Sequence, residues 1–431
     1  MTSTGPLLTL SSDLPGAIGQ SVRIAGWVHR LRELGGVTFM VVRDGAGLVQ
    51  VVNRVSDPML PDLTPETVVE VSGVVVAEAR APGGFEIHQP LVHVLDEPVE
   101  ALPLHLGGPE LAVGLDTRLN HAGLALRHPQ VRRVFRVQAA LAAGFRQALT
   151  DQNFVEVYTP KILGSATEGG ANVFTLNYFD RDAFLAQSPQ FYKQMLVGVF
   201  GRVFEVAPVF RAEPHDTGRH LSQYTSLDAE VGFIESHHTV MRILREALAV
   251  MMNEIERTVP DAPRLPVIPA EIPVIHFTEA LARISDAVGQ DVTGEPDLSP
   301  AHEAWLGEWA RDEAGSEFLF VQGYPTVKRP FYTMPDPDRP ASSRSFDLLF
   351  RGQEIVTGGQ RLHRYGDYRA ALAARGMAEA GLAGYLETFR CGMPPHGGFA
   401  IGLERLTARL MGLSNIREAT LFPRDMKRLA P

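Results

Sequence analysis

The segment that most constrains how this chain can fold is residues 209–231, VFRAEPHDTGRHLSQYTSLDAEV, where a charged loop joins two runs that resemble β-strands. Successive side chains of a strand point to opposite faces, so alternate residues share a face. In the second run the polar set is Tyr224, Ser226, Asp228 and Glu230. The alternating apolar set is Leu227, Ala229, Val231 and Phe233. We therefore expect one face of this strand to line a site and the other to pack in a core.

The loop between the two runs carries Arg211, Glu213, Arg219 and His220. An arginine fork binds phosphate oxygens bidentately and stays charged at any physiological pH. The chain contains neither a G-x-x-x-x-G-K-[ST] nor a G-x-G-x-x-G motif, so neither common glycine-rich phosphate loop is indicated. The loop therefore predicts a triphosphate held by side chains. An edge hairpin with a solvated, charged tip is the simpler alternative.

Composition excludes several classes of protein. The chain has 431 residues, 45% of them hydrophobic, which is enough for two or three domains with their own cores. No run approaches the roughly 20 apolar residues that span a bilayer, and the N-terminus lacks a signal-peptide pattern, so we expect a cytoplasmic protein without a membrane partner. A single cysteine, Cys391, excludes an internal disulfide or a cysteine-based zinc cluster. The net charge of −10 argues against a general polyanion binder but permits a local nucleic-acid site.

Residues 20–95 resemble five short strands separated by turn signals, which predicts a small barrel within a first domain of residues 1–97. Aromatic and polar residues on the second and third strands are the means by which an OB-type barrel binds unpaired bases. The candidate base-contacting residues on the strands are Trp27, His29, Phe39 and Gln50. Packing of Trp27 and Phe39 in the barrel core is the alternative.

The rest of the chain predicts a hinge and a larger domain. Prolines and glycines interrupt residues 98–130, so we expect a linker there. A helical period begins at residue 131 and runs into a strand at 154–162, in which Pro160 fits a strand end or edge. Further strands are expected at 201–211, 223–234, 345–357 and 397–402, and helices near 238–257, 278–286, 301–314, 367–386 and 403–412. Residues 131–431 therefore predict an α+β domain whose antiparallel sheet is flanked by helices.

A candidate metal site lies in residues 345–363, SFDLLFRGQEIVTGGQRLH. If this segment turns as a two-residue hairpin, Asp347 and Glu354 become diagonal neighbours on one face of the sheet. Two carboxylates are ligands that Mg²⁺ prefers beside water and phosphate, and the Thr357 hydroxyl adds another. A solvated hairpin with two surface acids is the alternative.

Five further residues are candidates for binding a small substrate or a nucleotide. Gln190 and Lys193 are three residues apart and share a face if their segment is helical. Glu168 lies in a loop of small residues, GSATEGGANVF, with the composition of a mobile lid that grips an ammonium group. Arg361 follows two glycines, which would admit a ligand close to the backbone. Arg405 lies off the apolar stripe of its helix and is suited to stack on a purine.

Three of these segments together resemble the three motifs of class II aminoacyl-tRNA synthetases. They are FVEVYTPKI with Pro160, FRAE…RHLSQYTSLD, and GFAIGLERL. QSPQFYKQ, EIVTGGQRLH and the N-terminal barrel narrow the resemblance to aspartyl-tRNA synthetases, subclass b, of the compact archaeal and eukaryal type, over nearly the whole chain. The resemblance implies an OB-fold anticodon-binding domain, a class II catalytic domain and a homodimer formed through motif one.

The resemblance also implies a role for each candidate residue. For ATP, the implied contacts are Arg211 to the α-phosphate, Glu213 to the adenine amino group, Arg219 and His220 to the distal phosphates, and Tyr224 and Arg405 to the two faces of adenine. For Mg²⁺, the implied ligands are Asp347, Glu354 and Thr357. For L-aspartate, the implied contacts are Glu168 and Asp228 to the ammonium group, Gln190 and Thr357 beside them, and Lys193 and Arg361 to the side-chain carboxylate. Arg211 and Arg405 would be the catalytic residues.

The implied reaction activates L-aspartate with ATP and transfers it to tRNA(Asp). Lys193 and Arg361 fit aspartate better than asparagine, because a neutral amide leaves both charges poorly compensated. The loop at residues 80–86, which contains Pro82, resembles that of members that also charge tRNA(Asn), so the choice of tRNA stays open. The other open alternatives are an asparaginyl-tRNA synthetase, a tRNA-independent asparagine synthetase and a non-catalytic RNA-binding relative.

Overall fold

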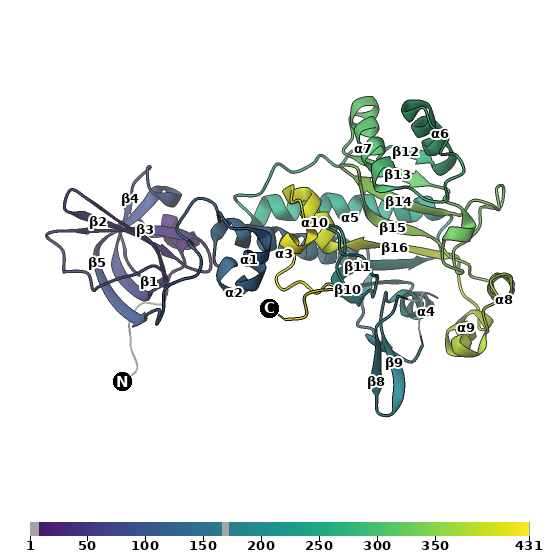
Figure 1. Cartoon of the computed structure of the whole chain (residues 1–431), viewed down its shortest axis with the longest axis horizontal. Helices are drawn as coiled ribbons and strands as arrows, with labels where there is room; N and C mark the ends of the chain where they lie inside the picture. The colour runs from purple at the N-terminus through teal and green to yellow at the C-terminus, as the bar shows by residue number, and fades with distance from the viewer. Residues whose placement is uncertain (1–7, 166–171, 431) are drawn as a thin grey trace. The chain divides into compact units, whose positions relative to one another are not determined.

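The computed structural model describes residues 8–165 and 172–430 (Figure 1). The chain divides into two compact units, Met1–Arg132 and Arg133–Pro431. Among the described residues, none of the helices combines the length and the apolar character that a bilayer crossing requires. The functional domain limits expected from the sequence, 1–97, 98–130 and 131–431, stay predictions.

The first unit is built around a closed five-stranded barrel in the order β1-β2-β3-β5-β4, as the sequence predicts. Its strands are β1 (Ser21–Leu34), β2 (Val37–Arg43), β3 (Leu48–Arg54), β4 (Val68–Ala77) and β5 (Phe85–Asp96), with short 3₁₀ helices η1 (Ser11–Ala17) and η2 (Pro82–Gly84). Alternate strand residues fill the interior, among them the fully buried Val28, Val42, Val51 and Val71. β-Branched side chains pack well on such a pleated surface, so the sequence favours these strands.

The predicted linker is an ordered part of the first unit. It contains two short helices, α1 (Leu115–Asn120) and α2 (Ala122–Ala125), and it buries Leu104 and Leu106. Just after these helices, Arg127 Nη1 donates to Glu66 Oε2 at 2.8 Å. The same carboxylate accepts two hydrogen bonds from Arg43 on the barrel, at 2.7 and 2.8 Å. The segment lacks a regular apolar period, yet it is held by buried leucines and a partly buried ion pair.

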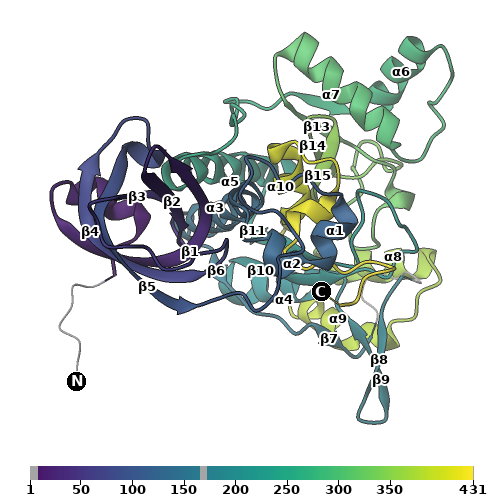
Figure 2. The ribbon, with the colours of Figure 1, turned by 60° about the vertical axis from the view of Figure 1, so that its left-hand side comes forward.

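The second unit is organised around an eight-stranded sheet in the order β12-β13-β14-β15-β16-β11-β10-β6 (Figure 1). Figure 2 shows β13, β14 and β15 as neighbours in this sheet. Its strands are β6 (Val155–Glu156), β10 (Arg202–Phe210), β11 (Gln223–Gly232), β12 (Val274–His276), β13 (Phe318–Gln322), β14 (Ser345–Phe350), β15 (Gln353–Gln360) and β16 (His396–Gly402). Neighbouring strands are antiparallel except at the two edges, where β6 pairs with β10 and β12 with β13 in parallel. The predicted α+β class with a mainly antiparallel sheet is confirmed.

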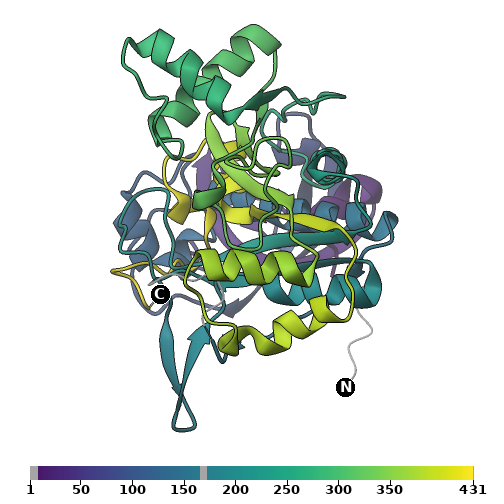
Figure 3. The same ribbon diagram turned by 90° about the vertical axis from the view of Figure 1, so that its right-hand side faces the viewer.

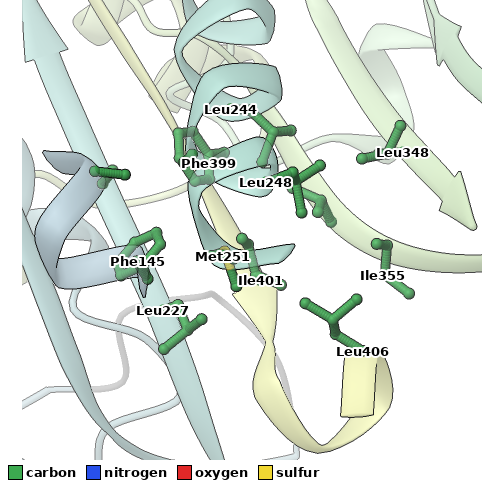
Figure 4. Packing of buried hydrophobic residues seen from close by; sticks show 14 of the residues in the cluster. Phe145, Leu227, Leu244, Leu248, Met251, Leu348, Ile355, Phe399, Ile401 and Leu406 are labelled. Carbon is green, nitrogen blue, oxygen red and sulfur yellow. The ribbon is translucent and has the colours of Figure 1, made fainter. Parts of the chain in front are cut away.

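Two long helices, α3 (Pro129–Asp151) and α5 (His237–Thr258), bury their apolar stripes against one face of this sheet. Apolar residues recur along both helices at the spacing of one helical face. In Figure 4, Leu244 of α5 lies beside Phe399 of β16, and Met251 of α5 lies beside Ile401 of β16. Since this face holds the core, the opposite face of the sheet is the one available for polar residues.

Smaller helices pack around the rest of the sheet. They are α4 (Gln190–Phe200), α6 (Phe277–Val288), α7 (Pro300–Ala314), α8 (Tyr365–Ala374), α9 (Ala383–Arg390) and α10 (Leu403–Met411), with 3₁₀ turns η3 (Thr326–Lys328), η4 (Ala380–Leu382) and η5 (Ile416–Ala419). Figure 3 shows the green pair α6 and α7 together, and the yellow-green pair α8 and α9 side by side. The first pair shares a core with β13, and the second shares an aromatic cluster with Phe191 of α4.

Two expected elements are shorter than the sequence predicts. The strand expected at 154–162 is only β6, and after Pro160 the chain enters β7 (Ile162–Leu163), because proline cannot donate to a sheet ladder. β7 joins β9 (Arg181–Leu185) and β8 (Thr175–Tyr178) in a three-stranded sheet that the sequence did not predict. The helix expected at 367–386 is two helices, since Gly376 with φ +64° follows the end of α8.

Phe233 is a further correction. The sequence places it on the apolar face of the strand expected at 223–234, but β11 ends at Gly232. Phe233 has φ +59° and is 81% exposed, so it does not belong to the core. A residue whose backbone is in the left-handed region interrupts a strand, so side chains beyond it no longer alternate between the two faces of the sheet.

Candidate active site

The polar face of β11 opens into a cavity of about 460 Å³. The seven residues predicted to bind ATP all line it: Arg211, Glu213, Arg219, His220, Tyr224, Glu354 and Arg405. Ser226 of β11, Thr357 of β15 and Glu404 of α10 line it as well. Three segments that are far apart in the sequence therefore meet at one cavity, as the motifs predict for a nucleotide site.

Three arginines line the cavity, beside acidic residues. The Arg211 guanidinium carbon lies 5.6 Å from the ring centre of Tyr224, and Arg211 Nη1 is 3.7 Å from Glu213 Oε1. Burial raises the pKa of the Tyr224 hydroxyl. Arg405 Nη1 donates to the carbonyl oxygen of Glu354 at 3.0 Å. The cavity thus offers a ring face for a base and two forks for phosphate.

Glu303 is a site residue that the sequence analysis missed. Arg219 Nη2 lies 2.6 Å from Glu303 Oε2, and the same oxygen accepts from the backbone N–H of Glu354 at 3.0 Å. Glu303 is in the first turn of α7, whose N-cap is Ser299. Acidic residues are common in the first turn of any helix. No local sequence signal therefore distinguishes Glu303 from a helix-start acid that has no role in a site.

The carboxylates predicted to bind a metal lie on neighbouring strands. The register pairs Asp347 with Thr357 and Leu349 with Glu354, and the two pairs are separated by an irregularity. Arg351 and Gly352 form the two-residue turn that was predicted, with φ of 49° and 74°. Asp347 and Glu354 are close enough for the charge of Glu354 to raise the pKa of Asp347.

The donor set around Asp347 fits Mg²⁺. Asp347 Oδ1 is buried and has no hydrogen-bond partner among the described residues, while Oδ2 accepts from Arg329 Nη2 at 2.7 Å. Burial raises the pKa of Asp347 to about 6; the Arg329 charge opposes this shift and Glu354 adds to it. The Thr357 hydroxyl donates to Glu354 Oε1 at 3.1 Å. Residues 8–165 and 172–430 contain no group of three His, Cys, Asp or Glu that could hold a metal, so substrate phosphate and water would complete the shell.

Farther along β11, its polar face becomes a buried ionic cluster. Lys193 Nζ lies 2.7 Å from Asp228 Oδ1 and 3.6 Å from Glu230 Oε2. Arg361 Nε lies 2.9 Å from Glu230 Oε1. Gln190 contacts both Arg361 and Glu230 from the first turn of α4. The five residues are at most 7% exposed, so the predicted aspartate-binding residues Gln190, Lys193, Asp228 and Arg361 form one buried cluster.

Glu230 is the residue of this pocket to which the sequence analysis gave no role. Burial alone would raise the pKa of Glu230, but the charges of Arg361 and Lys193 outweigh it, so the pKa lies below its usual value and the side chain is an anion. A Cβ on Gly398 of β16 would collide with Glu230 Oε2. The alternation of β11 does place Glu230 on the face of Asp228, and this was the available signal.

Two other expectations were that Gly358 and Gly359 admit a ligand and that Glu168 lies on a lid. A Cβ on Gly358 would overlap the Phe346 ring, and a Cβ on Gly359 would lie 2.7 Å from the carbonyl oxygen of Arg344. These glycines admit the neighbouring strand β14, and the prediction that they admit a ligand is wrong. Glu168, predicted on a lid, lies outside the described residues.

On the barrel, Phe39 and Gln50 lie on the same outer face, because the register pairs Phe39 with Val52 and Val41 with Gln50. Gln50 Nε2 donates to Glu86 Oε1 at 2.6 Å. Both side chains are half-buried. Their shared face agrees with the arrangement expected for a base-binding surface, and their contact with RNA stays a prediction.

Trp27 and His29 lie in a different environment. Trp27 is covered by Arg43 and Arg127, whose guanidinium carbons are 5.4 and 6.0 Å from its ring. His29 is 6% exposed, and burial lowers its pKa to about 4. Contrary to the prediction, His29 is not displayed on the barrel surface. Pro82 begins the 3₁₀ turn η2, and its role in tRNA choice stays a prediction.

Sequence comparison identifies the family. The family model described as tRNA synthetases class II (D, K and N) matches residues 114–426. The model described as OB-fold nucleic acid binding domain matches residues 22–95. An aspartate–tRNA(Asp/Asn) ligase of Thermus thermophilus is 46% identical over 98% of this chain and 99% of its own length. One of Deinococcus radiodurans is 45% identical over 99% and 100%, and an aspartate–tRNA(Asp) ligase of Pyrococcus abyssi is 39% identical over 96% and 97%.

Solved structures show the same fold. The asparaginyl-tRNA synthetase from Pyrococcus horikoshii complexed with asparaginyl-adenylate has a TM-score of 0.89 at 31% identity, over 98% of this chain and 99% of that one. The aspartyl-tRNA synthetase from Entamoeba histolytica has a TM-score of 0.86 at 31% identity, over 100% and 94%. The fold therefore does not separate aspartate from asparagine enzymes. The chain belongs to the class II tRNA synthetases of the D, K and N group and carries an OB-fold nucleic acid binding domain before its catalytic domain.

Proposed function

We propose that this protein is an aspartate–tRNA ligase, which activates L-aspartate with ATP and transfers it to the 3′ end of tRNA(Asp). The observation that carries the proposal is the polar face of β11, which runs from the cavity at Tyr224 to the buried ionic cluster at Asp228. At about 3.3 Å per residue the two positions are about 13 Å apart, so one aspartyl-adenylate spans them. Relatives named aspartate–tRNA ligases, at 38% to 46% identity, support this choice.

The reaction has two steps. In the first, an oxygen of the aspartate α-carboxylate attacks the α-phosphorus of ATP, the bond to the bridging oxygen breaks, and pyrophosphate leaves. Arg211 stabilises the α-phosphate, Arg219 and His220 hold the distal phosphates, and Tyr224 and Arg405 hold the adenine, with Glu213 at its amino group. In the second step, a terminal hydroxyl of tRNA attacks the acyl carbon and AMP leaves. Orientation and charge stabilisation supply the rate, so no protein nucleophile is needed.

Mg²⁺ is proposed as the ion held by Asp347 and Glu354, with Thr357 bound directly or through water. When bound, it would neutralise charge on the phosphate oxygens. Arg329 holds one oxygen of Asp347, which leaves Oδ1 free to meet a cation. The hydrogen bond from Thr357 keeps Glu354 Oε1 on the cavity side of β15.

Aspartate recognition requires an exchange of ion pairs. Lys193 and Arg361 are already balanced by Asp228 and Glu230, so a count of cations does not by itself select aspartate. We propose that the substrate ammonium group replaces Lys193 Nζ on Asp228, assisted by Glu168. Lys193 is then released to the side-chain carboxylate beside Arg361. Asparagine has no charge at that end and would leave Lys193 uncompensated in a buried pocket.

The tRNA partners are proposed to include tRNA(Asn) as well as tRNA(Asp). Relatives named for both tRNAs, from Thermus thermophilus and Deinococcus radiodurans, support this choice. The barrel face with Phe39 and Gln50 is the proposed anticodon surface, and the turn at Pro82 is the proposed determinant of relaxed choice. The cytoplasm, where tRNA is charged, is the proposed location.

A homodimer is proposed through motif one. β6 is the edge strand of the large sheet, and large apolar side chains near it are exposed. They are Val155 (40%), Tyr158 (81%), Phe200 (48%) and Phe233 (81%). An exposed edge with such an apolar patch favours covering by a second copy. Light scattering of the purified protein tests this proposal through its molar mass.

The activity is tested by charging purified tRNA(Asp) and tRNA(Asn) separately, with labelled aspartate and then with labelled asparagine. We expect aspartate on both tRNAs and asparagine on neither. Charging with asparagine alone would establish the asparaginyl alternative. This alternative is tested because the fold also matches the asparaginyl-tRNA synthetase from Pyrococcus horikoshii. Aspartate-dependent exchange of pyrophosphate into ATP reports the first step without tRNA.

A further inference from the structure

A second cavity of about 320 Å³ adjoins the nucleotide cavity. The two cavities share Arg219, Arg405 and Ile416 in their linings. The second cavity is thus adjacent to the end of the site where Arg219 is expected to hold the distal phosphates. It extends toward Arg409 on α10 and the turn at Gly352.

The charges of the two linings differ. The second cavity is lined by the guanidinium groups of Arg219, Arg405 and Arg409, with neither an acid nor an aromatic ring among the described residues that line it. The nucleotide cavity, by contrast, is lined by four acids: Glu213, Asp297, Glu354 and Glu404. A ligand of the second cavity is therefore a strong anion without a base to stack, such as a free polyphosphate.

Arg409 is the cation that distinguishes the second cavity from the first. Its Nη2 donates to the carbonyl oxygen of Arg351, and its Nε is buried without a hydrogen-bond partner among the described residues. Burial lowers the pKa of Arg409, the neighbouring charges of Arg219 and Arg351 lower it further, and the charge of Glu303 opposes the shift. Arg219 and Arg405 are paired with Glu303 and Glu354, so Arg409 is the cation of this lining whose charge an anion would compensate.

We propose that this arginine-lined cavity receives inorganic pyrophosphate after it has separated from the adenylate. The inference rests on the proposed function, because pyrophosphate is the product of its first step. Arg219 lines both cavities and is expected to hold the distal phosphates, so pyrophosphate can pass from one cavity to the other without losing its contact with Arg219. Gly218, Ala304 and Gly352 keep the walls of the second cavity free of large side chains.

The first test measures pyrophosphate exchange into ATP at varied pyrophosphate and at varied ATP. Arg409→Gln removes the charge, and we expect the KM for pyrophosphate to rise about tenfold, the effect of one charge-assisted hydrogen bond. The KM for ATP should change less than about twofold, because Arg409 does not line the nucleotide cavity. Arg409→Lys keeps the charge and should recover most of the loss, which a purely structural role of the Arg351 contact would not explain.

A second variant avoids any change to Arg409. Ala304 is an exposed residue of α7 that lines the second cavity. Ala304→Glu introduces a carboxylate there without disturbing a core, so it should also raise the KM for pyrophosphate. Ala301→Glu is the matched control, since Ala301 is exposed on the same helix but does not line the cavity.

Failure of the pyrophosphate site can be distinguished from failure of the proposed function. An unchanged KM for pyrophosphate in both Arg409→Gln and Ala304→Glu overturns the receiving site. Should the intact protein show no aspartate-dependent exchange, the proposed function fails first. Equilibrium dialysis of labelled pyrophosphate with the full chain then decides the site alone. Weaker binding by both variants than by Ala301→Glu supports the site, and equal binding rejects it.

Discussion

At the scale of single residues, four buried charges decide what the amino-acid pocket can bind. Lys193, Asp228, Glu230 and Arg361 compensate one another within 3.6 Å and are almost fully buried. Removing one member leaves an unpaired charge away from water, which costs about 3–5 kcal/mol. Under the proposed function, a charged substrate would therefore enter by exchanging partners with these residues, and selectivity would follow from which exchanges leave no charge uncompensated.

Lys193→Met tests this exchange. We expect the KM for aspartate in pyrophosphate exchange to rise about 100-fold, because the substrate carboxylate loses its charged partner. Thermal unfolding should also occur at a lower temperature, since Asp228 loses its ion pair. Arg283→Met is the control, because Arg283 forms an ion pair with Glu279, at 2.8 Å, on α6 and outside the pocket. A KM for aspartate that Lys193→Met leaves unchanged contradicts the proposed role.

Glu404 gives the stability a predictable dependence on pH. It is 5% exposed, and burial raises its pKa to about 7 from an ordinary value of 4.5, although the backbone N–H of Thr225 favours the anion. The folded state therefore binds the proton more tightly than the unfolded state. The free energy of unfolding should fall by about 3 kcal/mol as the pH rises from about 4.5 to about 7.

Calorimetry between pH 5 and pH 8 checks this expectation. Glu404→Gln does not ionise, so its unfolding temperature should decline less with rising pH than that of the unaltered protein. Glu313→Gln, at an exposed position of α7, serves as the control and should follow the unaltered protein. Parallel pH profiles for Glu404→Gln and the unaltered protein would falsify the assignment.

At the scale of elements, the pairing of β11 with β16 sets the geometry of the aspartate pocket. The register places Glu230 opposite Gly398, and Ala229 opposite Phe399. A side chain at position 398 would collide with the backbone oxygen of Ala229 and with Glu230 Oε2. Arg361 Nη2 also donates to the carbonyl oxygen of Gly398 at 3.1 Å. The glycine therefore lets two strands and an ion pair meet in one place.

Gly398→Ala should disturb this pocket selectively. The added methyl group displaces Glu230 and with it Arg361, so we expect the KM for aspartate to rise about tenfold or more. The KM for ATP should rise much less, because the nucleotide cavity lies nearer the other end of β11. Gly384→Ala in α9 is the control, since a Cβ there meets no atom within 4 Å. Equal effects of Gly398→Ala on both substrates would point to general unfolding instead.

How far the sequence predicts these elements depends on whether their cause is local. The alternation from Tyr224 to Glu230 and the turn at Gly352 are properties of neighbouring residues, and both are confirmed. Glu303 and Arg329 reach the site through tertiary packing alone, so no local pattern could reveal them. Phe233 was wrongly placed on the apolar face of the strand, because alternation of polar and apolar residues does not show where a strand ends.

At the scale of the whole molecule, the chain has two units with separate cores. The cavity at Tyr224 and the pocket at Asp228 lie in the second unit, while Phe39 and Gln50 lie in the first. Pyrophosphate exchange needs only the proposed chemistry of the second unit, whereas tRNA charging also needs the RNA surface proposed for the first. The two assays therefore separate the contributions of the units without cutting the chain.

Phe39→Ala exploits this separation. Stacking of a base on an aromatic ring contributes about 1–3 kcal/mol, so loss of the ring should lower kcat/KM for tRNA by roughly 5-fold to 150-fold. Aspartate-dependent pyrophosphate exchange should stay within about twofold, since no exchange substrate contacts the proposed RNA surface. Leu91→Ala removes an apolar side chain that is 62% exposed on β5 of the same barrel, and it should leave charging unchanged. If Phe39→Ala and Leu91→Ala charge tRNA equally well, Phe39 is a barrel packing residue and the anticodon surface lies elsewhere.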